Sequence, residues 1–300
     1  MKQNKPLRIG TRASALALWQ AEKLQRELNA LGYATVLVPI HSEGDQNLTQ
    51  PLYEMGTVGI FTKALDIALL NNQIDLAIHS MKDVPTQLPN GIIQAAVLER
   101  GNSSDILVWS NKEEKNTIAT GSLRRKAQWL ERYPEDEIVP LRGNIQTRLK
   151  QLNSQAWNGA VFAAAALERL KISEEQVEVL DWMIPAPAQG ALMVVTLEEN
   201  KELAQILQEL NHPLVEQCTS IERDFLRTLE GGCTAPIGAF AYFENGSLHF
   251  KGGVFSLQKK EGITLQKKVA HYSDKLGKKW AEEILALGGA ALLKEFKSEQ

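Results

Sequence analysis

The chain of 300 residues has few cysteines, no long apolar run and no surplus of basic residues, and each scarcity excludes a class of protein. Its two cysteines, Cys218 and Cys233, match neither a CxxC redox pair nor a four-ligand zinc site. No uninterrupted apolar run approaches membrane-spanning length, and the first residues lack the apolar core of a signal peptide. We therefore expect a cytoplasmic protein that contacts no membrane, holds no metal and forms no disulfide in a reducing compartment.

The charge balance excludes a second class. Lys and Arg total 33 against 36 Asp and Glu, which gives a formal net charge of −3. This balance argues against a dedicated nucleic-acid-binding protein, although it allows local basic patches. The composition, 44% hydrophobic and 23% charged, is typical of a globular protein, and the length suggests two or three domains.

The first part of the chain alternates short apolar runs with amphipathic stretches. Residues 7–10, 34–40 and 74–80 are predicted strands, and helices are predicted from Ser14 and over 60–70. This βαβαβ order predicts a mostly parallel sheet covered by helices.

The same pattern then restarts. Strands are predicted at 106–110, 117–120, 138–141 and 160–165, and 192–198 is a strand that could rejoin the first sheet. We predict two α/β lobes with a ligand cleft between them, the first formed by 1–98 with 192–211 and the second by 99–191.

The last part of the chain has a different pattern. One helix reaches Leu229, three strand-like runs follow, and a helix runs through 280–289. Asn245-Gly246 between two of these runs is a hairpin signal. We predict a small α+β domain over 212–300 with an antiparallel sheet, and a mobile lid at the polar loop 41–59.

Arginines recur where a predicted strand gives way to a predicted helix. Ser14 and Ser122 are placed to cap such helices, whose N-termini favour anions. A guanidinium there can hold a carboxylate through two parallel hydrogen bonds. Solvated surface arginines are the competing interpretation, and the repetition makes the two about equally favoured. Phosphate is the competing anion, but the chain has no phosphate-loop motif. The arginines in this pattern are Arg12, Arg124, Arg125, Arg142, Arg148 and Arg169.

The segment 78–85 places polar groups at the carboxyl end of a buried strand, where α/β active sites are built. Asp83 could stabilise a developing cation or move a proton, and Lys82 could pair with an anion. A Lys-Asp surface turn is the alternative, and His79 is more simply a hydrogen-bonded core residue.

The two cysteines lie in different surroundings. Cys218 falls on the apolar face of a predicted helix and is most simply a core residue. Cys233 follows Gly231 and Gly232, which indicates an exposed thiol. No histidine signature accompanies it, so a covalent anchor fits better than a turning-over nucleophile.

Six motifs in order resemble the hydroxymethylbilane synthase family, also called the porphobilinogen deaminase family. They are RIGTRASALALWQA, AIHSMKDVP, GSLRRKAQW, LRGNIQTRL, AAAALERL and ERDFLRTLEGGCTAPIGA, covering residues 7 to about 240. The resemblance implies three domains, the first two similar to periplasmic solute-binding proteins, in a monomer. It implies an enzyme that condenses four porphobilinogen molecules head to tail, releases ammonia, and then hydrolyses the linear tetrapyrrole from its primer.

The resemblance also implies roles for individual residues. Cys233 would carry a dipyrromethane cofactor through a thioether, and Asp83 would be the catalytic residue that holds pyrrole N–H groups and stabilises a cationic azafulvene-like electrophile. The remaining cofactor-binding residues would be Lys82, Ser122, Arg124 and Arg125, and the substrate-binding residues Arg12, Ser14, Arg142, Arg148, Arg169 and Gln189.

Three positions depart from the pattern of the family: Gly121 replaces a serine, and Ala166 and Ala188 replace glycines. They put loop geometry and one hydroxyl contact in question. Two other classes compete with the synthase. A solute-binding protein would capture an anion without chemistry, and a thiol hydrolase would need a histidine near Cys233. The extra C-terminal domain and Cys233 argue against the first, and the missing histidine signature argues against the second.

Overall fold

The computed structural model describes residues 5–41, 62–110, 116–174, 176–229 and 235–297. The predicted lid at 41–59, apart from its first residue, and the predicted anchor Cys233 lie outside the described residues. Contacts divide the chain into two compact units. The first unit comprises the described residues of Met1–Asn47, Thr57–Gly101 and Gly190–Glu216, and the second those of Asn102–Gln189 and Gln217–Gln300.

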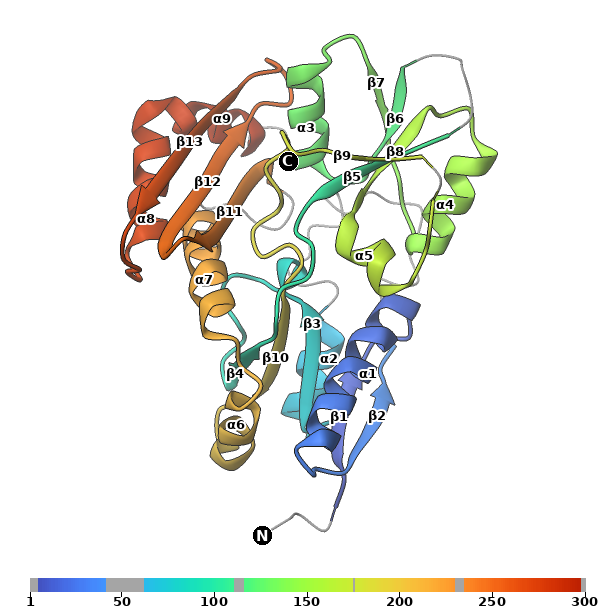
Figure 1. The fold of residues 1–300 in the computed structure, drawn as a ribbon, viewed down its shortest axis with the longest axis vertical. Helices are drawn as coiled ribbons and strands as arrows, with labels where there is room; N and C mark the ends of the chain where they lie inside the picture. The colour runs from blue at the N-terminus through green and yellow to red at the C-terminus, as the bar shows by residue number, and fades with distance from the viewer. Residues whose placement is uncertain (1–4, 42–61, 111–115, 175, 230–234, 298–300) are drawn as a thin grey trace. The chain divides into compact units, whose positions relative to one another are not determined.

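The first unit contains a five-stranded sheet of order β2-β1-β3-β10-β4 (Figure 1). Its central strands β1 (Leu7–Thr11) and β3 (Leu76–Ser80) are parallel, and so are β1 and β2 (Thr35–Pro39). β10 (Leu192–Leu197) runs antiparallel between β3 and β4 (Ile92–Val97), which confirms that the chain returns to the first sheet.

Three helices belong to this sheet: α1 (Ala15–Ala30), α2 (Lys63–Leu70) and α6 (Lys201–Gln208). The helix α1 begins where predicted, because the Ser14 side chain accepts a hydrogen bond from the Ala17 N–H. Its side chains Leu24 and Leu28 are fully buried and pack with strand residues of the sheet. The apolar face predicted from the spacing is therefore the face that packs on the sheet.

The second unit contains another five-stranded sheet, of order β7-β6-β8-β5-β9. Its members are β5 (Asp105–Trp109), β6 (Thr117–Ala119), β7 (Glu137–Val139), β8 (Gly159–Ala163) and β9 (Val177–Val179). β6 runs parallel to β7 and β8, and β5 runs antiparallel to β8 and β9. Its helices are α3 (Leu123–Arg132), α4 (Ile145–Ser154) and α5 (Ala164–Arg169). The predicted strand 160–165 therefore ends at Ala163, because α5 begins at the next residue.

The second unit also contains a three-stranded antiparallel sheet of β11 (Ile237–Glu244), β12 (Ser247–Phe255) and β13 (Gly262–Val269). The predicted hairpin turn is confirmed, since Asn245 and Gly246 join β11 to β12 with φ values of 50° and 75°. The helices α7 (Pro213–Thr228), α8 (Leu276–Ile284) and α9 (Ala290–Lys297) accompany the sheet (Figure 1), and a π-helical turn, Leu285–Gly289, joins the last two. Phe250 belongs to the core that they share. Its ring centroid lies 4.6 Å from that of Trp280 and 5.2 Å from that of Phe225. The predicted fold class, two α/β sheets and a small α+β part, is confirmed.

Candidate active site

The first unit gathers predicted site residues at one edge of its sheet. Arg12 follows β1, and Lys82 and Asp83 lie in a short 3-10 turn, Met81–Asp83, directly after β3. Because β1 and β3 are parallel neighbours, both of these strand ends lie at the same edge. We call Arg12, Ser14, Lys82 and Asp83 the first edge cluster.

The turn that carries Asp83 is anchored by its apolar neighbours. Met81 and Val84 are buried, and the Met81 N–H donates to the Ala191 carbonyl at 3.0 Å. The Asp83 side chain is only half-buried, and no described residue donates a hydrogen bond to its carboxylate or forms an ion pair with it. A fixed backbone therefore carries a carboxylate that is open to a ligand.

His79 lies beside this edge, and it is a core residue as predicted. Burial, followed by the nearby charge of Arg12, lowers the pKa of His79 to about 4, so the imidazole is neutral at pH 7. The predicted hydrogen bonding is not found at one ring atom, because Nε2 has no partner among the described residues. A neutral, enclosed imidazole contributes no positive charge to the first edge cluster.

The second unit brings three strand ends to one edge of its sheet. The strands β6, β7 and β8 are parallel, so α3, α4 and α5 all start at that edge. Ser122 and Asn144 cap α3 and α4 with their side chains, the first as predicted. The predicted site residues that follow these strands form the second edge cluster, which consists of Ser122, Arg124, Arg125, Arg142, Arg148 and Arg169.

Three arginines of the second edge cluster are half-buried. Arg148 Nε donates to the Gly143 carbonyl at 2.8 Å, which orients the guanidinium along the start of α4. Burial lowers the pKa of Arg142, and it lowers the pKa of Arg169 to about 10 against the opposing effect of Glu168. Both guanidinium groups therefore remain charged at neutral pH and can attract anions.

Arg124 and Arg125 are placed differently, because both side chains are buried against one carboxylate. Arg124 Nη1 lies 2.7 Å from Asp105 Oδ2, and Arg125 Nε and Nη2 lie 2.9 and 2.7 Å from Asp105 Oδ1. Burial alone raises the pKa of Asp105, but the two guanidinium charges outweigh it and hold the pKa below its usual range. No sequence pattern indicated this carboxylate, whose arginine partners lie 19 and 20 residues away along the chain.

Gln189 belongs to the same network. Its side chain is fully buried, and Nε2 donates to the Ser103 carbonyl at 2.8 Å and to Asp105 Oδ1 at 3.0 Å. The structure thus connects Gln189 to the arginines through Asp105.

Glu222 is a second buried carboxylate that the sequence did not reveal. Its two oxygens accept hydrogen bonds from the N–H groups of Ala188 and Ala241, at 2.6 and 2.7 Å. Ala188 has a φ of 62°, in the left-handed region that glycine adopts at least cost. Glu222 therefore holds the loop before Gln189 in a conformation that suits a glycine.

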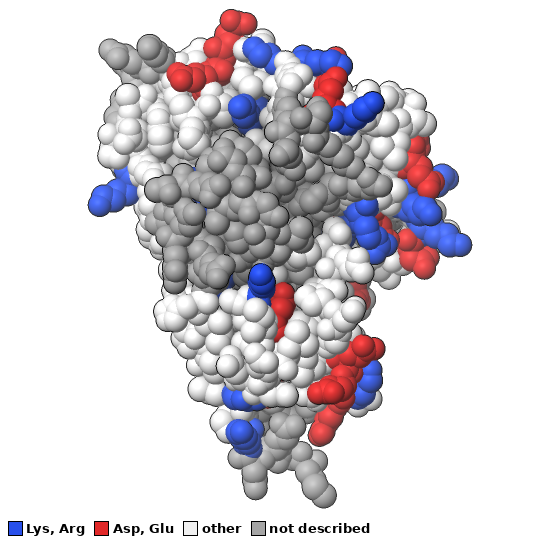
Figure 2. All heavy atoms as spheres, turned by 180° about the vertical axis from the view of Figure 1, so that it is seen from behind, with Lys and Arg blue, Asp and Glu red and all other residues white. Residues whose placement is uncertain are grey.

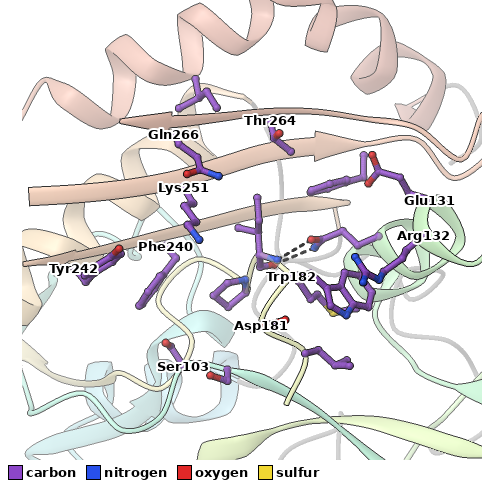
Figure 3. A pocket seen from close by; sticks show the side chains of 18 residues that line it. Ser103, Glu131, Arg132, Asp181, Trp182, Phe240, Tyr242, Lys251, Thr264 and Gln266 are labelled. Carbon is purple, nitrogen blue, oxygen red and sulfur yellow. Dashed lines mark hydrogen bonds between the residues drawn. The ribbon is translucent and has the colours of Figure 1, made fainter. Parts of the chain in front are cut away.

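One cavity of about 620 Å³ lies elsewhere in the second unit, between α3, the segment 180–185 and the open face of the three-stranded sheet (Figure 3). Its walls carry the rings of Trp182, Phe240 and Tyr242 and the ammonium-bearing side chain of Lys251. None of the predicted site residues is among the residues that line it. The predicted site residues that carry a charge therefore lie in the two edge clusters, at strand ends, and not in this cavity.

On the face shown in Figure 2, the described Lys and Arg side chains do not form a separate basic patch. There, Lys and Arg side chains are interspersed with Asp and Glu side chains. This mixture agrees with the formal net charge of −3. The described charges on this face therefore form no broad basic patch that would attract an anion.

Comparison with known families matches nearly the whole chain. Residues 7–205 match the family described as "Porphobilinogen deaminase, dipyromethane cofactor binding domain", and residues 216–286 match "Porphobilinogen deaminase, C-terminal domain". The chain belongs to the porphobilinogen deaminase family. The resemblance inferred from six motifs is thereby confirmed.

Individual relatives have the same extent. The porphobilinogen deaminase of Chloroherpeton thalassium is 38% identical over 311 residues, which cover 98% of this chain and 99% of the relative. The porphobilinogen deaminase of Syntrophotalea carbinolica is 40% identical over 299 residues, which cover 96% of this chain and 95% of the relative. The similarity therefore includes the C-terminal part as well as both α/β sheets.

Among solved structures, the chain is similar to the periplasmic VFT2 domain of BvgS from Bordetella pertussis. The sequence identity is 13%, the TM-score is 0.41, and the match covers 68% of this chain and 86% of that domain. The fold class is assigned from the strand order of the three sheets and not from this similarity. Within the described residues, no helix is long and apolar enough to cross a membrane.

Proposed function

We propose that the chain catalyses the reaction of its family as a hydroxymethylbilane synthase. This transferase joins four porphobilinogen molecules head to tail with release of ammonia and then hydrolyses the linear product from its primer, a step of tetrapyrrole biosynthesis. The observation that carries the proposal is the family match over 7–205 and 216–286, within which the motifs around Asp83 and Cys233 are intact.

The residues of the second edge cluster fit the dipyrromethane cofactor of the family. Arg124 and Arg125 face a single carboxylate, so the buried group keeps an excess of positive charge that suits the acetate and propionate side chains of a pyrrole. We infer that Cys233 holds the cofactor covalently, with Ser122, Arg124, Arg125, Lys82 and Asp83 as further binding residues. When bound, the dipyrromethane supplies the pyrrole α-carbon to which the first substrate unit is joined.

Asp83 is the proposed catalytic residue. Loss of ammonia from porphobilinogen leaves an electron-deficient methylene-pyrrole cation, and a nearby carboxylate stabilises such a charge. The Asp83 carboxylate has no hydrogen-bond or ion-pair partner in the described part of the chain, so its oxygens can accept pyrrole N–H groups. The anchored turn around it supports a fixed position during the reaction.

The substrate carboxylates require cations, which both edge clusters supply. We propose that Arg12, Arg142, Arg148 and Arg169 bind acetate and propionate groups, with Ser14 assisting. The charges of Arg142 and Arg169 persist at neutral pH despite burial, which supports this role. Gln189 was predicted to bind substrate, and its buried contact with Asp105 supports an indirect contribution instead.

The proposal extends to the location, the oligomeric state and the domain organisation of the protein. We propose a cytoplasmic monomer that binds no nucleic acid. We also propose three domains, formed by 1–98 with 192–211, by 99–191 and by 212–300, and a loop at 41–59 that shields the reactive cation from water.

The test is incubation of the purified protein with porphobilinogen, with ammonia and linear tetrapyrrole quantified together. The proposed function predicts four ammonia molecules for each tetrapyrrole released. Saturable binding of porphobilinogen without any ammonia would contradict it and would favour a solute-binding protein. Cys233→Ser is the matched variant, and it is expected to remain folded but to form no tetrapyrrole.

A further inference from the structure

Asp105, the first residue of β5, is a fully buried carboxylate that contacts two arginines of the second edge cluster. It is 0% exposed, and it accepts hydrogen bonds from both Arg124 and Arg125 and from Gln189. A buried carboxylate with charged donors on both oxygens has little freedom to move.

Each arginine is also fixed by a backbone carbonyl. Arg124 Nη1 donates to the Ile184 carbonyl at 2.7 Å, and Arg125 Nη1 donates to the Val161 carbonyl at 2.8 Å. Together with the bonds to Asp105, these bonds use two of the five N–H groups of Arg124 and three of the five of Arg125. Both guanidinium groups are therefore held in one orientation while donors remain on each.

The charges in this network do not balance. Two guanidinium groups share one carboxylate, and the side chains of Arg124 and Arg125 are only 4% and 7% exposed. By contrast, Arg8 and Asp75 in the first unit form a balanced one-to-one pair, about one quarter exposed. A buried group with uncompensated charge is unfavourable for stability alone, so the arrangement indicates a role in binding an anion.

We propose that Asp105 and Gln189 are positioning residues, which orient Arg124 and Arg125 so that their remaining donors and their one excess positive charge receive a carboxylate of the dipyrromethane. The inference rests on the proposed function and deepens it by assigning two residues that act through the arginines. Asp105 limits the excess charge to one unit, and Gln189 holds the carboxylate that both guanidinium groups share.

The experiment compares Asp105→Asn with wild type and with Asp75→Asn, which removes the balanced ion pair at the opposite end of the parallel strands of the first sheet. Each purified protein is first shown to be folded by circular dichroism and thermal unfolding. The fraction carrying the covalent primer is then read from the denatured intact mass, and the KM for porphobilinogen is measured on the loaded fraction. Loss of charged hydrogen bonds corresponds to roughly tenfold or more in binding. We expect the loaded fraction of Asp105→Asn to fall, or its KM to rise, about tenfold, with Asp75→Asn unchanged in both.

A folded Asp105→Asn protein with wild-type loading and wild-type KM would overturn the inference, even if its thermal stability were lower. If Asp105→Asn fails to fold, Gln189→Met replaces it, because this change leaves both ion pairs in place and preserves side-chain volume. We expect the loaded fraction of Gln189→Met to fall, or its KM to rise, about threefold, as for one lost hydrogen bond, and wild-type loading together with a wild-type KM would overturn the inference. If wild type itself carries no primer and forms no tetrapyrrole, the proposed function fails instead, so the two failures are distinguishable.

Discussion

The two units build their sheet edges from the same elements but leave opposite groups available. In the first unit, the turn after β3 holds Asp83 half-buried with no described partner. In the second unit, the helix after β6 holds Arg124 and Arg125 buried against Asp105. One edge therefore offers an open carboxylate, and the other offers positive charge in excess of its internal partner.

This difference agrees with the proposed roles, chemistry at Asp83 and binding at Arg124 and Arg125. A reacting group needs access to the substrate, whereas a group that receives a carboxylate works best when its orientation is fixed in advance. A strand end followed by a polar turn therefore does not define one role. The partners inside the protein decide which charges remain for a ligand.

The largest expected effect comes from removing the open carboxylate. Asp83→Asn should reduce turnover at least about a hundredfold, because the neutral amide no longer stabilises a developing cation. Stability should change little, since no described residue depends on Asp83 for a hydrogen bond or ion pair. Porphobilinogen consumption and thermal unfolding are the two measurements.

Asp83→Ala is the stricter version of the same test, because it removes both oxygens. Normal consumption of porphobilinogen by a folded Asp83→Ala protein would remove the catalytic role from this residue. The two sheet edges would then not differ in chemical role.

The next effect concerns the neutral histidine beside the first edge cluster. Because the pKa of His79 is lowered to about 4 in the folded protein, the unfolded chain takes up its proton first as the pH falls. The stability associated with His79 is present above about pH 6.5 and is lost as the pH falls toward 4, by about 3 kcal/mol in all. Denaturant unfolding of wild type and His79→Leu across this range measures the difference.

Asp105 should contribute in a separate pH window. Its pKa is held below the usual range, so the stability it provides is lost only below about pH 4.

The His79 prediction has its own contradicting outcome. Equal pH dependence of the unfolding free energy in wild type and His79→Leu between pH 4 and 6.5 would show that His79 is not enclosed as described.

A smaller effect distinguishes arginines within the second edge cluster. Arg125→Lys keeps the charge but loses the fork that contacts Asp105 and Val161, so we expect a loss of about 2 kcal/mol in stability together with reduced activity. Arg142→Lys should reduce activity with a smaller loss of stability, because this side chain is half-buried. Unfolding free energies and kcat/KM of both variants provide the comparison, and two silent variants would show that neither guanidinium contributes to binding or to stability.

The smallest effects concern the three departures from the pattern of the family. A Cβ at Gly121 would lie 2.5 Å from the Leu141 carbonyl oxygen, so Gly121→Ser should destabilise the turn before α3 by about 1–3 kcal/mol. Ala188 has a φ of 62°, so Ala188→Gly should stabilise the protein by up to about 1 kcal/mol. Ala166 lies inside α5, so Ala166→Gly should destabilise it by about 1 kcal/mol.

Chemical denaturation of the three variants measures these effects. The opposite signs expected for the two glycine substitutions are their own control, since the same chemical change is made in two backbone conformations. A loss of stability in Ala188→Gly equal to that in Ala166→Gly would show that the left-handed conformation of Ala188 carries no strain.

Much of the fold was predictable because its signals are local. Ser14 and Ser122 cap their helices as expected, and Asn245-Gly246 forms the hairpin turn. The return of 192–197 to the first sheet was predictable from its apolar run. In each case neighbouring residues contain the necessary information.

The internal partners of the site were not predictable in this way. Asp105 resembles any acidic residue at the start of a strand, and Gln189 lies 84 positions away from it in the sequence. The strain at Ala188 and the carboxylate of Glu222 that holds its N–H likewise depend on contacts between distant segments. Single-sequence patterns do not report such contacts, so the sequence indicated candidate arginines but not the residues that hold them.

The most direct test of the account is the denatured intact mass of the purified protein, with any added mass mapped by peptide digestion. We expect a dipyrromethane-sized increment on the peptide that contains Cys233, either as isolated or after incubation with porphobilinogen or preformed hydroxymethylbilane. A Cys233 that stays unmodified after such incubation, with no tetrapyrrole formed, would contradict it.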